Sequence, residues 1–82
     1  MTFATSNEQA VTAVVTYAQE RASLPSPALR SAIRRSAGVT LAQLASALDV
    51  SASAVWLWET GQRMPRPERL LRYAELLREL GR

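Results

Sequence analysis

The charged residues of this 82-residue chain offer one kind of chemistry, which is the binding of anions by arginine. All ten basic residues are Arg, seven residues are acidic, and the formal net charge is +3. Nine of the ten Arg lie from Arg30 onward together with five acidic residues, so this part of the chain has a net charge of +4. Such a basic segment favours a polyanionic partner, although a solvated surface can have the same composition.

The residue types that catalysis and metal binding usually need are missing. The sequence contains no Cys and no His, which excludes disulfides, zinc fingers, thiolate chemistry and imidazole acid–base catalysis. Ser51 and Ser53 are the nearest candidates for a nucleophile, but no general base accompanies them, and a serine at a helix start is usually a cap. The sequence therefore predicts no enzyme, no metal site and no cofactor.

Length and hydropathy predict one small domain in the cytoplasm. No apolar stretch approaches the roughly 18 residues needed to cross a bilayer. The first nine residues are polar and slightly acidic, without the basic and apolar regions of a secretory signal. We therefore expect no membrane association.

The first elements that the pattern predicts are a helix and a proline-rich linker that ends it. Ser6 and Gln9 have the spacing of a capping box, which predicts a helix from about Asn7 to Ala22. Its apolar residues recur at three- and four-residue spacing on one face: Val11, Val14, Val15, Ala18 and Ala22. Such a stripe is more often core than anything else, and the alternative is that this helix mediates dimerisation. Pro25 and Pro27 end this helix, so residues 1–26 form an N-terminal helix with a Pro-rich linker and residues 27–82 a second unit.

The second unit contains four further helix patterns. A helix should begin at Pro27 or Ala28, with Leu29 and Ile33 on its apolar face, and end near Gly38. The other expected helices are Leu41–Leu48 capped by Thr40, Ala52–Thr60 capped by Ser51 and closed by Gly61, and one from Pro67 to near Gly81. Asp49 can adopt the left-handed conformation that the turn between Leu41–Leu48 and Ala52–Thr60 requires. The predicted fold is all-α, with five helices.

Two short helices joined by a tight turn can present the second helix to the DNA major groove. The segment from Leu29 to Leu80 contains, in this order, Arg34, Thr40, Leu44-Ala45, Val50-Ser51, Val55, Trp58-Glu59, Gly61 and Pro65. With these residues it resembles the Cro/repressor-type (XRE-like) helix-turn-helix family. Two positions depart from the family pattern: Leu41 stands where a phosphate-binding Gln is common, and Asp49 stands where the turn Gly is common.

The resemblance assigns roles to individual residues. It points the following side chains at base edges: Ser51, Ala52, Ser53, Trp56 and Leu57. It implies phosphate or minor-groove contacts from Thr40, Arg63, Arg66 and Arg35, although surface charge is the simpler interpretation of Arg35. Because the base-edge set contains no Arg, Asn or Gln, only hydroxyl and apolar readout is expected, supplemented by DNA shape.

Two further pairs of residues concern the position of the third predicted helix of this unit. The resemblance implies a structural, partly buried ion pair between Arg34 and Glu59. Trp56 and Trp58 are two residues apart and must lie on different faces, so Trp58, in phase with Val55, is expected in the core and Trp56 at the surface.

The predicted function is sequence-specific binding of double-stranded DNA by a small transcriptional regulator, similar to the Cro-like repressors of phage or bacteria. A homodimer is expected because the last helix has more apolar residues than one face can bury. The alternative is a protein-interaction module, such as an antitoxin or a subunit of a phage switch, which the nonpolar recognition positions and an exposed Trp56 favour.

Overall fold

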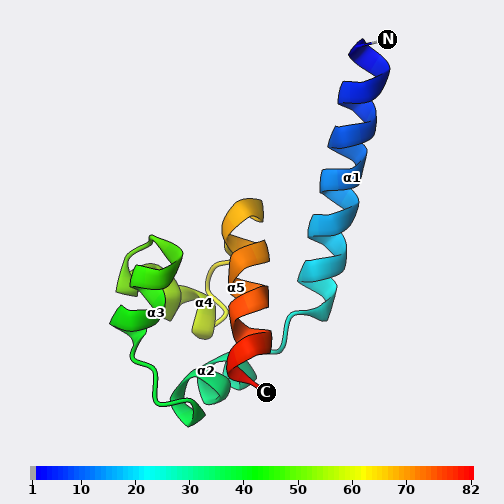
Figure 1. Ribbon diagram of the computed structural model, residues 1–82. Coiled ribbons are helices and arrows are strands. Elements are labelled where there is room, and N and C mark those ends of the chain that lie inside the picture. Colours follow the sequence, from blue (N-terminus) through cyan, green and yellow to red (C-terminus); the bar gives the residue numbers. More distant parts are fainter. Residues whose placement is uncertain (1) are drawn as a thin grey trace.

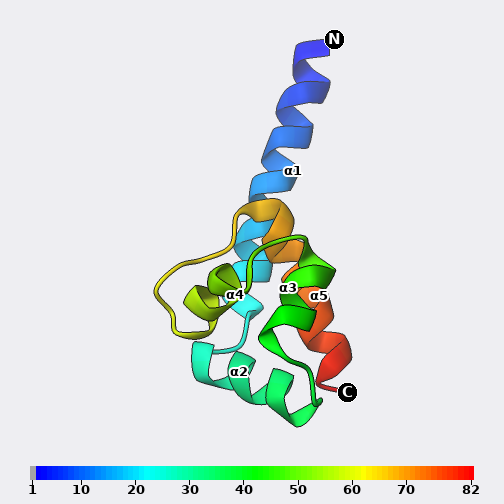
Figure 2. The ribbon, with the colours of Figure 1, turned by 90° about the vertical axis from the view of Figure 1, so that its left-hand side faces the viewer.

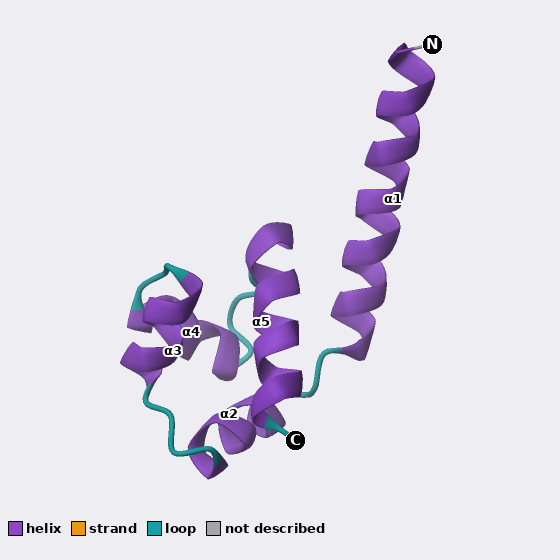
Figure 3. Cartoon of the chain, viewed as in Figure 1, coloured by secondary structure: helices purple, strands orange, loops and turns teal. Residues whose placement is uncertain are grey.

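The fold is built from five helices and no strand within the part of the chain that is described. The computed structural model describes the backbone of residues 2–82 and the side chains of residues 7–82. The helices are α1 (Thr2–Ser23), α2 (Pro27–Ser36), α3 (Leu41–Leu48), α4 (Ala52–Glu59) and α5 (Pro67–Leu80), joined by short loops (Figures 1 and 3). The expected all-α, five-helix architecture is confirmed.

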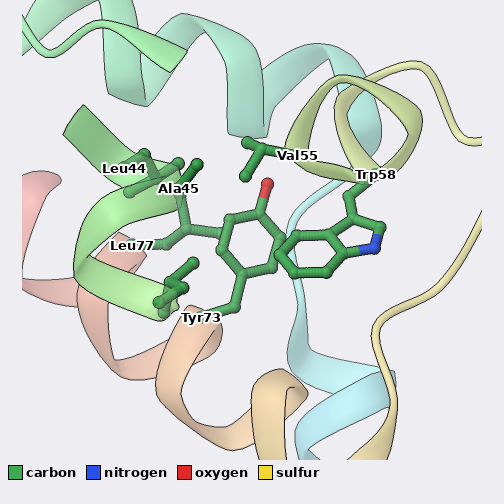
Figure 4. Packing of buried hydrophobic residues seen from close by; sticks show 7 residues of the cluster. Leu44, Ala45, Val55, Trp58, Tyr73 and Leu77 are labelled. Atoms are coloured by element: carbon green, nitrogen blue, oxygen red, sulfur yellow. The ribbon is translucent and has the colours of Figure 1, made fainter. Parts of the chain in front are cut away.

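Helices α2 to α5 surround one hydrophobic core. Its buried apolar residues come from α3 (Leu44, Ala45, Leu48), α4 (Val55, Trp58) and α5 (Leu70, Tyr73, Ala74, Leu77). The Tyr73 ring occupies the centre, with Val55 and Trp58 on one side (Figure 4). The Trp58 and Tyr73 rings are tilted by 48° with centroids 5.1 Å apart, which is a favourable aromatic arrangement. This contact joins α4 directly to α5.

The local signals of the second unit predicted its helices closely. Helix α3 has the expected bounds, and Asp49 after it is left-handed, with φ 56° and ψ 48°. Helix α4 ends one residue earlier than expected, because Thr60 is its C-cap and Gly61 follows with φ 75°. Pro67 occupies the first turn of α5, as expected.

The start of the N-terminal helix was predicted wrongly. Helix α1 begins at Thr2, so Ser6 lies inside the helix and the expected capping box with Gln9 does not start it. The segment before Ser6 contains no Gly or Pro, and nothing there interrupts the i to i−4 hydrogen-bond pattern. Met1 lies outside the described residues.

The valine face of α1 is not part of the core of its own chain, although such a stripe is usually core. Val11, Val14 and Val15 are exposed by 62%, 67% and 46%. The only helix that α1 contacts within the described chain is α5, which separates α1 from α3 and α4 (Figures 1 and 2). The first half of α1 therefore extends away from the other four helices and gives the molecule extents of 49 × 22 × 22 Å.

The buried face of α2 also differs from the expectation. Leu29 is 50% exposed, whereas Arg30 beside it is buried and Ile33 is partly buried against the core. The face of α2 that meets α4 thus consists largely of arginine side chains.

Candidate nucleic-acid interface

Helices α3 and α4 begin with the same type of cap. Thr40 and Ser51 have extended backbones, and each hydroxyl oxygen accepts a backbone N–H three residues on: Gln43 N donates to Thr40 at 3.0 Å, and Ala54 N donates to Ser51 at 3.1 Å. A hydroxyl that accepts one hydrogen bond can still donate its proton to a phosphate or base. Neither first turn contains an acidic residue, so both helix N-termini keep their partial positive charge.

The turn between α3 and α4 is fixed by backbone hydrogen bonds. Asp49 N donates to the carbonyls of Ala45 and Ser46, and Val50 N donates to Ala45 O at 3.0 Å. The positive φ of Asp49 makes this closure possible without glycine, at some conformational cost. Its carboxylate is almost fully exposed and lies 3.9 Å from Arg69, too far for a strong ion pair.

One face of α4 is exposed and uncharged, while the other is in the core. Ser51, Ala52 and Ser53 are exposed, Trp56 is 49% exposed, and Leu57 is half-buried. On the opposite side, Val55 and Trp58 are 0% and 5% exposed. The two tryptophans therefore lie as their spacing indicates, and the residues expected at base edges share the accessible side of α4.

Two arginines lie in the loop directly after α4. Arg63 and Arg66 are exposed, and both line a groove that Leu57 of α4 also lines. The start of this loop is held to α4 because the backbone N–H groups of Gln62 and Arg63 both donate to Leu57 O, at 2.9 and 3.2 Å. Pro65 further along is buried. The loop thus places two cations at fixed points beside the accessible side of α4.

Arg35 does not join this cluster. Gly61, before the loop arginines, faces the first residue of α2, where an added Cβ would lie 3.1 Å from the Pro27 ring. Arg35 lies in the last turn of α2, roughly 12 Å further along its axis by the rise of an α-helix. Any phosphate bound by Arg35 would therefore differ from those bound by Arg63 and Arg66. Thr40 is exposed at the start of α3.

A buried ion pair joins α2 to the end of α4. Arg34 Nε donates to Glu59 Oε2 at 2.6 Å and Arg34 Nη2 donates to Glu59 Oε1 at 3.0 Å, while Nη1 donates to Val39 O at 2.8 Å. The two side chains are only 11% and 5% exposed. The hydrogen bonds to Glu59 raise the pKa of Arg34 above its ordinary value, although burial opposes this shift. Arg34 therefore remains charged and positions α4 against α2.

Arg30 makes a second link that the sequence did not indicate. Its Nε donates to Pro25 O at 2.7 Å and its Nη1 donates to Trp58 O at 2.9 Å. Burial lowers the pKa of Arg30, and Tyr73 opposes that shift. A signal was available, because Arg30 and Arg34 are four residues apart and so share a face of α2. Arg30 fixes the C-terminal end of α4 to the linker after α1.

Gln43 is another contributor that sequence reasoning missed. Its Oε1 accepts the Thr40 N–H at 2.9 Å, which completes a reciprocal capping box at the start of α3. The Thr-x-x-Gln spacing was visible in the sequence. The box fixes the rotamer of Thr40, whose hydroxyl is one of the candidate phosphate donors.

The sequence of α2 to α5 matches a known family. The chain matches the family model described as "Helix-turn-helix domain" over residues 29–81, which is more than half of its length. The chain belongs to this helix-turn-helix family. The match runs from α2 to the end of α5 and leaves out α1. No curated protein and no solved structure matches the chain.

Membership of this family agrees with the expected XRE-like character of the chain, and α3 and α4 are its helix-turn-helix pair. In such a pair the second helix is the one that enters the major groove. Among residues 2–82, no helix is long and apolar enough to cross a membrane, and no three potential metal ligands are clustered.

Proposed function

We propose that this helix-turn-helix protein is a sequence-specific, DNA-binding transcriptional regulator, a Cro-like repressor of phage or bacterial origin that acts in the cytoplasm. The observation that carries the proposal is the accessible, uncharged side of α4 with Arg63 and Arg66 fixed beside it. In the proposed complex α4 enters the major groove, and two copies bind two half-sites on double-stranded DNA.

The contacts divide into phosphate binding and base readout. Arg63 and Arg66 bind phosphates, or the minor groove in the case of Arg66, and the Thr40 hydroxyl and the N-termini of α3 and α4 add further donors. Base readout falls to the hydroxyls of Ser51 and Ser53 and to apolar contacts of Ala52, Trp56 and Leu57 with thymine methyl groups. Such readout is weaker than bidentate Arg–guanine pairing, so DNA shape contributes to specificity.

The test is binding of the full chain to its own flanking intergenic DNA and to random DNA across a salt series. Arg63→Ala should weaken binding to both and lower the slope of log K against log salt by about 1, as removal of one phosphate contact predicts. Arg82→Ala is the matched control, because it removes the same charge from an exposed ion pair with Glu79, outside both the loop after α4 and the contact of α1 with α5.

A second variant tests the position of α4 itself. Ala52→Asp puts a carboxylate at the first helical position of α4, where it favours the helix but repels DNA. Selective binding that this variant abolishes, and that Ala52→Ser retains, supports the proposal. Equal weak binding to every fragment, unchanged by Ala52→Asp, contradicts it.

A protein-interaction role is the second candidate, and two observations favour it. Trp56 is a large apolar side chain with 49% of its surface exposed. The groove beside α4 has apolar walls that include Val50, Leu57 and Met64. An antitoxin or phage-switch subunit could bury both against its partner. Association that is insensitive to salt and abolished in Trp56→Ala would favour this function over DNA binding.

A further inference from the structure

Helix α1 is attached to the other helices along one side of its second half. The half-buried residues of this stretch and the linker after it are Thr16, Tyr17, Glu20, Leu24 and Pro25. Glu20 accepts a hydrogen bond from Arg78 of α5 at 3.0 Å, and Leu24 lines a pocket with Ala74 and Leu77 of α5. These contacts determine which face of α1 is turned toward α5.

The opposite face of α1 is apolar and exposed. At about 100° per residue, Val11, Val14, Val15, Ala18 and Ala22 lie on the side of the helix away from Thr16 and Glu20. All five are exposed, and the eleven residues from Gln9 to Gln19 include no charge. Isolated helices in water are rarely stable when they are rich in β-branched residues, as residues 11–16 are. This face therefore needs a partner that the described chain does not supply.

The charges at the two ends of this face indicate what the partner is. Exposed Glu8 lies before Val11, and exposed Arg21 lies after Ala18. The midpoint between Glu8 and Arg21 falls between Val14 and Val15. An antiparallel copy of the same helix, centred there, would bring Glu8 and Arg21 to the same level along the axis at both ends, on opposite flanks of the interface, with Val14 and Val15 at the middle. A parallel copy would oppose Glu8 to Glu8 and Arg21 to Arg21.

We propose that the valine face of α1 binds α1 of a second copy of this chain in an antiparallel, two-fold symmetric pair. A two-fold interface uses the same patch on both subunits, so it requires a patch that is complementary to itself, and this one is. The pair buries the valines of both chains and leaves no charge without an opposite at the interface ends. Because α5 separates α1 from α3 and α4, the pair leaves the candidate DNA interface free on both copies (Figure 1).

This inference deepens the proposed function, which requires two copies but does not assign the surface that joins them. The dimer is measured without DNA, so its failure is distinguishable from failure of DNA binding. A dimer that binds no DNA contradicts the proposed function alone, and a DNA-binding monomer contradicts the dimer alone.

The first experiment is sedimentation equilibrium of the full chain at micromolar concentrations. The wild type should be a dimer, and Val14→Glu should raise its dissociation constant at least roughly tenfold, because the pair would bury two unpaired carboxylates. Gln9→Glu is the matched control, since Gln9 is exposed on the opposite side of α1 and its variant should dimerise like the wild type. Thermal unfolding followed by circular dichroism should show that α2 to α5 remain folded in both variants, as Val14 is not part of their core.

The second experiment tests the orientation of the two helices. Because the sequence contains no cysteine, each introduced Cys is the only thiol that can be cross-linked. In the antiparallel pair, Glu8 of one copy lies about 20 Å along the axis from Glu8 of the other, by the rise of 1.5 Å per residue. Glu8→Cys and Arg21→Cys chains should therefore cross-link with a short bismaleimide when mixed, but not separately. A monomeric wild type, or a dimer that Val14→Glu leaves unchanged, overturns the proposal and assigns the valine face to a different protein. Cross-linking of Glu8→Cys alone overturns the antiparallel orientation.

Discussion

Replacing Glu59 with Gln should destabilise the fold far more than the same change in an exposed ion pair. The substitution keeps the shape of the side chain but leaves the Arg34 guanidinium, 11% exposed, without a compensating charge. The amide oxygen of the introduced Gln can still accept one of the two Arg34 hydrogen bonds, which are 2.6 and 3.0 Å long. The amide NH2 group cannot accept the other, because it is itself a donor and faces an Arg34 N–H. Breaking a buried pair in this way costs about 3–5 kcal/mol.

The magnitude is large relative to the stability of so small a protein. At roughly 0.05–0.15 kcal/mol per residue, the whole chain is stable by about 4–12 kcal/mol. The residual solvent contact of Arg34 places the expected cost near the lower limit, at about 3 kcal/mol. With a urea m-value of about 1–1.5 kcal/mol/M, the denaturation midpoint should fall by about 2–3 M.

The assay is urea denaturation followed by circular dichroism. Glu79→Gln is the matched control, because Glu79 pairs with Arg82 at 3.2 Å and the two side chains are 58% and 77% exposed. Its destabilisation should be below about 0.5 kcal/mol. The double variant Arg34→Met/Glu59→Leu should recover most of the stability, since it removes both buried charges. A Glu59→Gln destabilisation below about 1 kcal/mol, or a double variant whose destabilisation equals the sum of the single effects, would refute this account of how α4 is held.

Two further changes test the core and the turn. Burial raises the pKa of Tyr73 to about 12 from 10.0, with Glu59 adding to the shift and Arg30 and Arg34 opposing it. Because the folded state holds this proton more tightly, stability should be unaffected below pH 10 and fall by roughly 1.4 kcal/mol per unit between pH 10 and 12. Tyr73→Phe should abolish this dependence of stability on pH. It should cost little stability at neutral pH, because the hydroxyl has no hydrogen-bond partner among the described residues. The measurement is urea denaturation at several pH values, and an unchanged pH dependence in the variant would contradict the assignment to Tyr73. Asp49→Gly should stabilise the chain by about 0.5–1 kcal/mol, because it relieves a positive φ of 56° and removes only a long ion pair with Arg69. A lowered thermal midpoint of this variant would show that the Arg69 ion pair matters more than the backbone conformation.

The helix-turn-helix pair could be read from the sequence because its signals are local. Thr40, Asp49 and Ser51 define the ends of α3 and α4 through bonds to residues at most four positions away. The spacing of Val55, Trp56 and Trp58 was enough to separate the core face of α4 from its accessible face. In α3 and α4, pattern and propensity therefore sufficed, whereas the equally local pattern of Ser6 and Gln9 did not mark the start of α1.

The errors fall where position depends on distant contacts. The valines of α1 have the spacing of a core stripe, but spacing does not say which element covers a stripe, and α5 contacts the other side of α1. Arg30 was assigned no role from the sequence, because its acceptors, Pro25 O and Trp58 O, come together only in the folded chain. The roles of Ser51, Ala52, Ser53, Trp56 and Leu57 at DNA remain predictions that the binding assays address.

The double hydrogen bond of Arg30 has a consequence for where the protein can be divided. The family match begins at residue 29, which suggests that a cut before Pro27 would release a complete unit. Such a cut would remove Pro25 O, one of the two acceptors of a buried guanidinium whose other acceptor is Trp58 O at the end of α4. The start of the family match therefore does not separate two parts that would fold independently. We therefore expect the linker and α4 to unfold as parts of one cooperative unit, so that whatever binds α1 is mechanically connected to α4, the helix proposed to bind DNA.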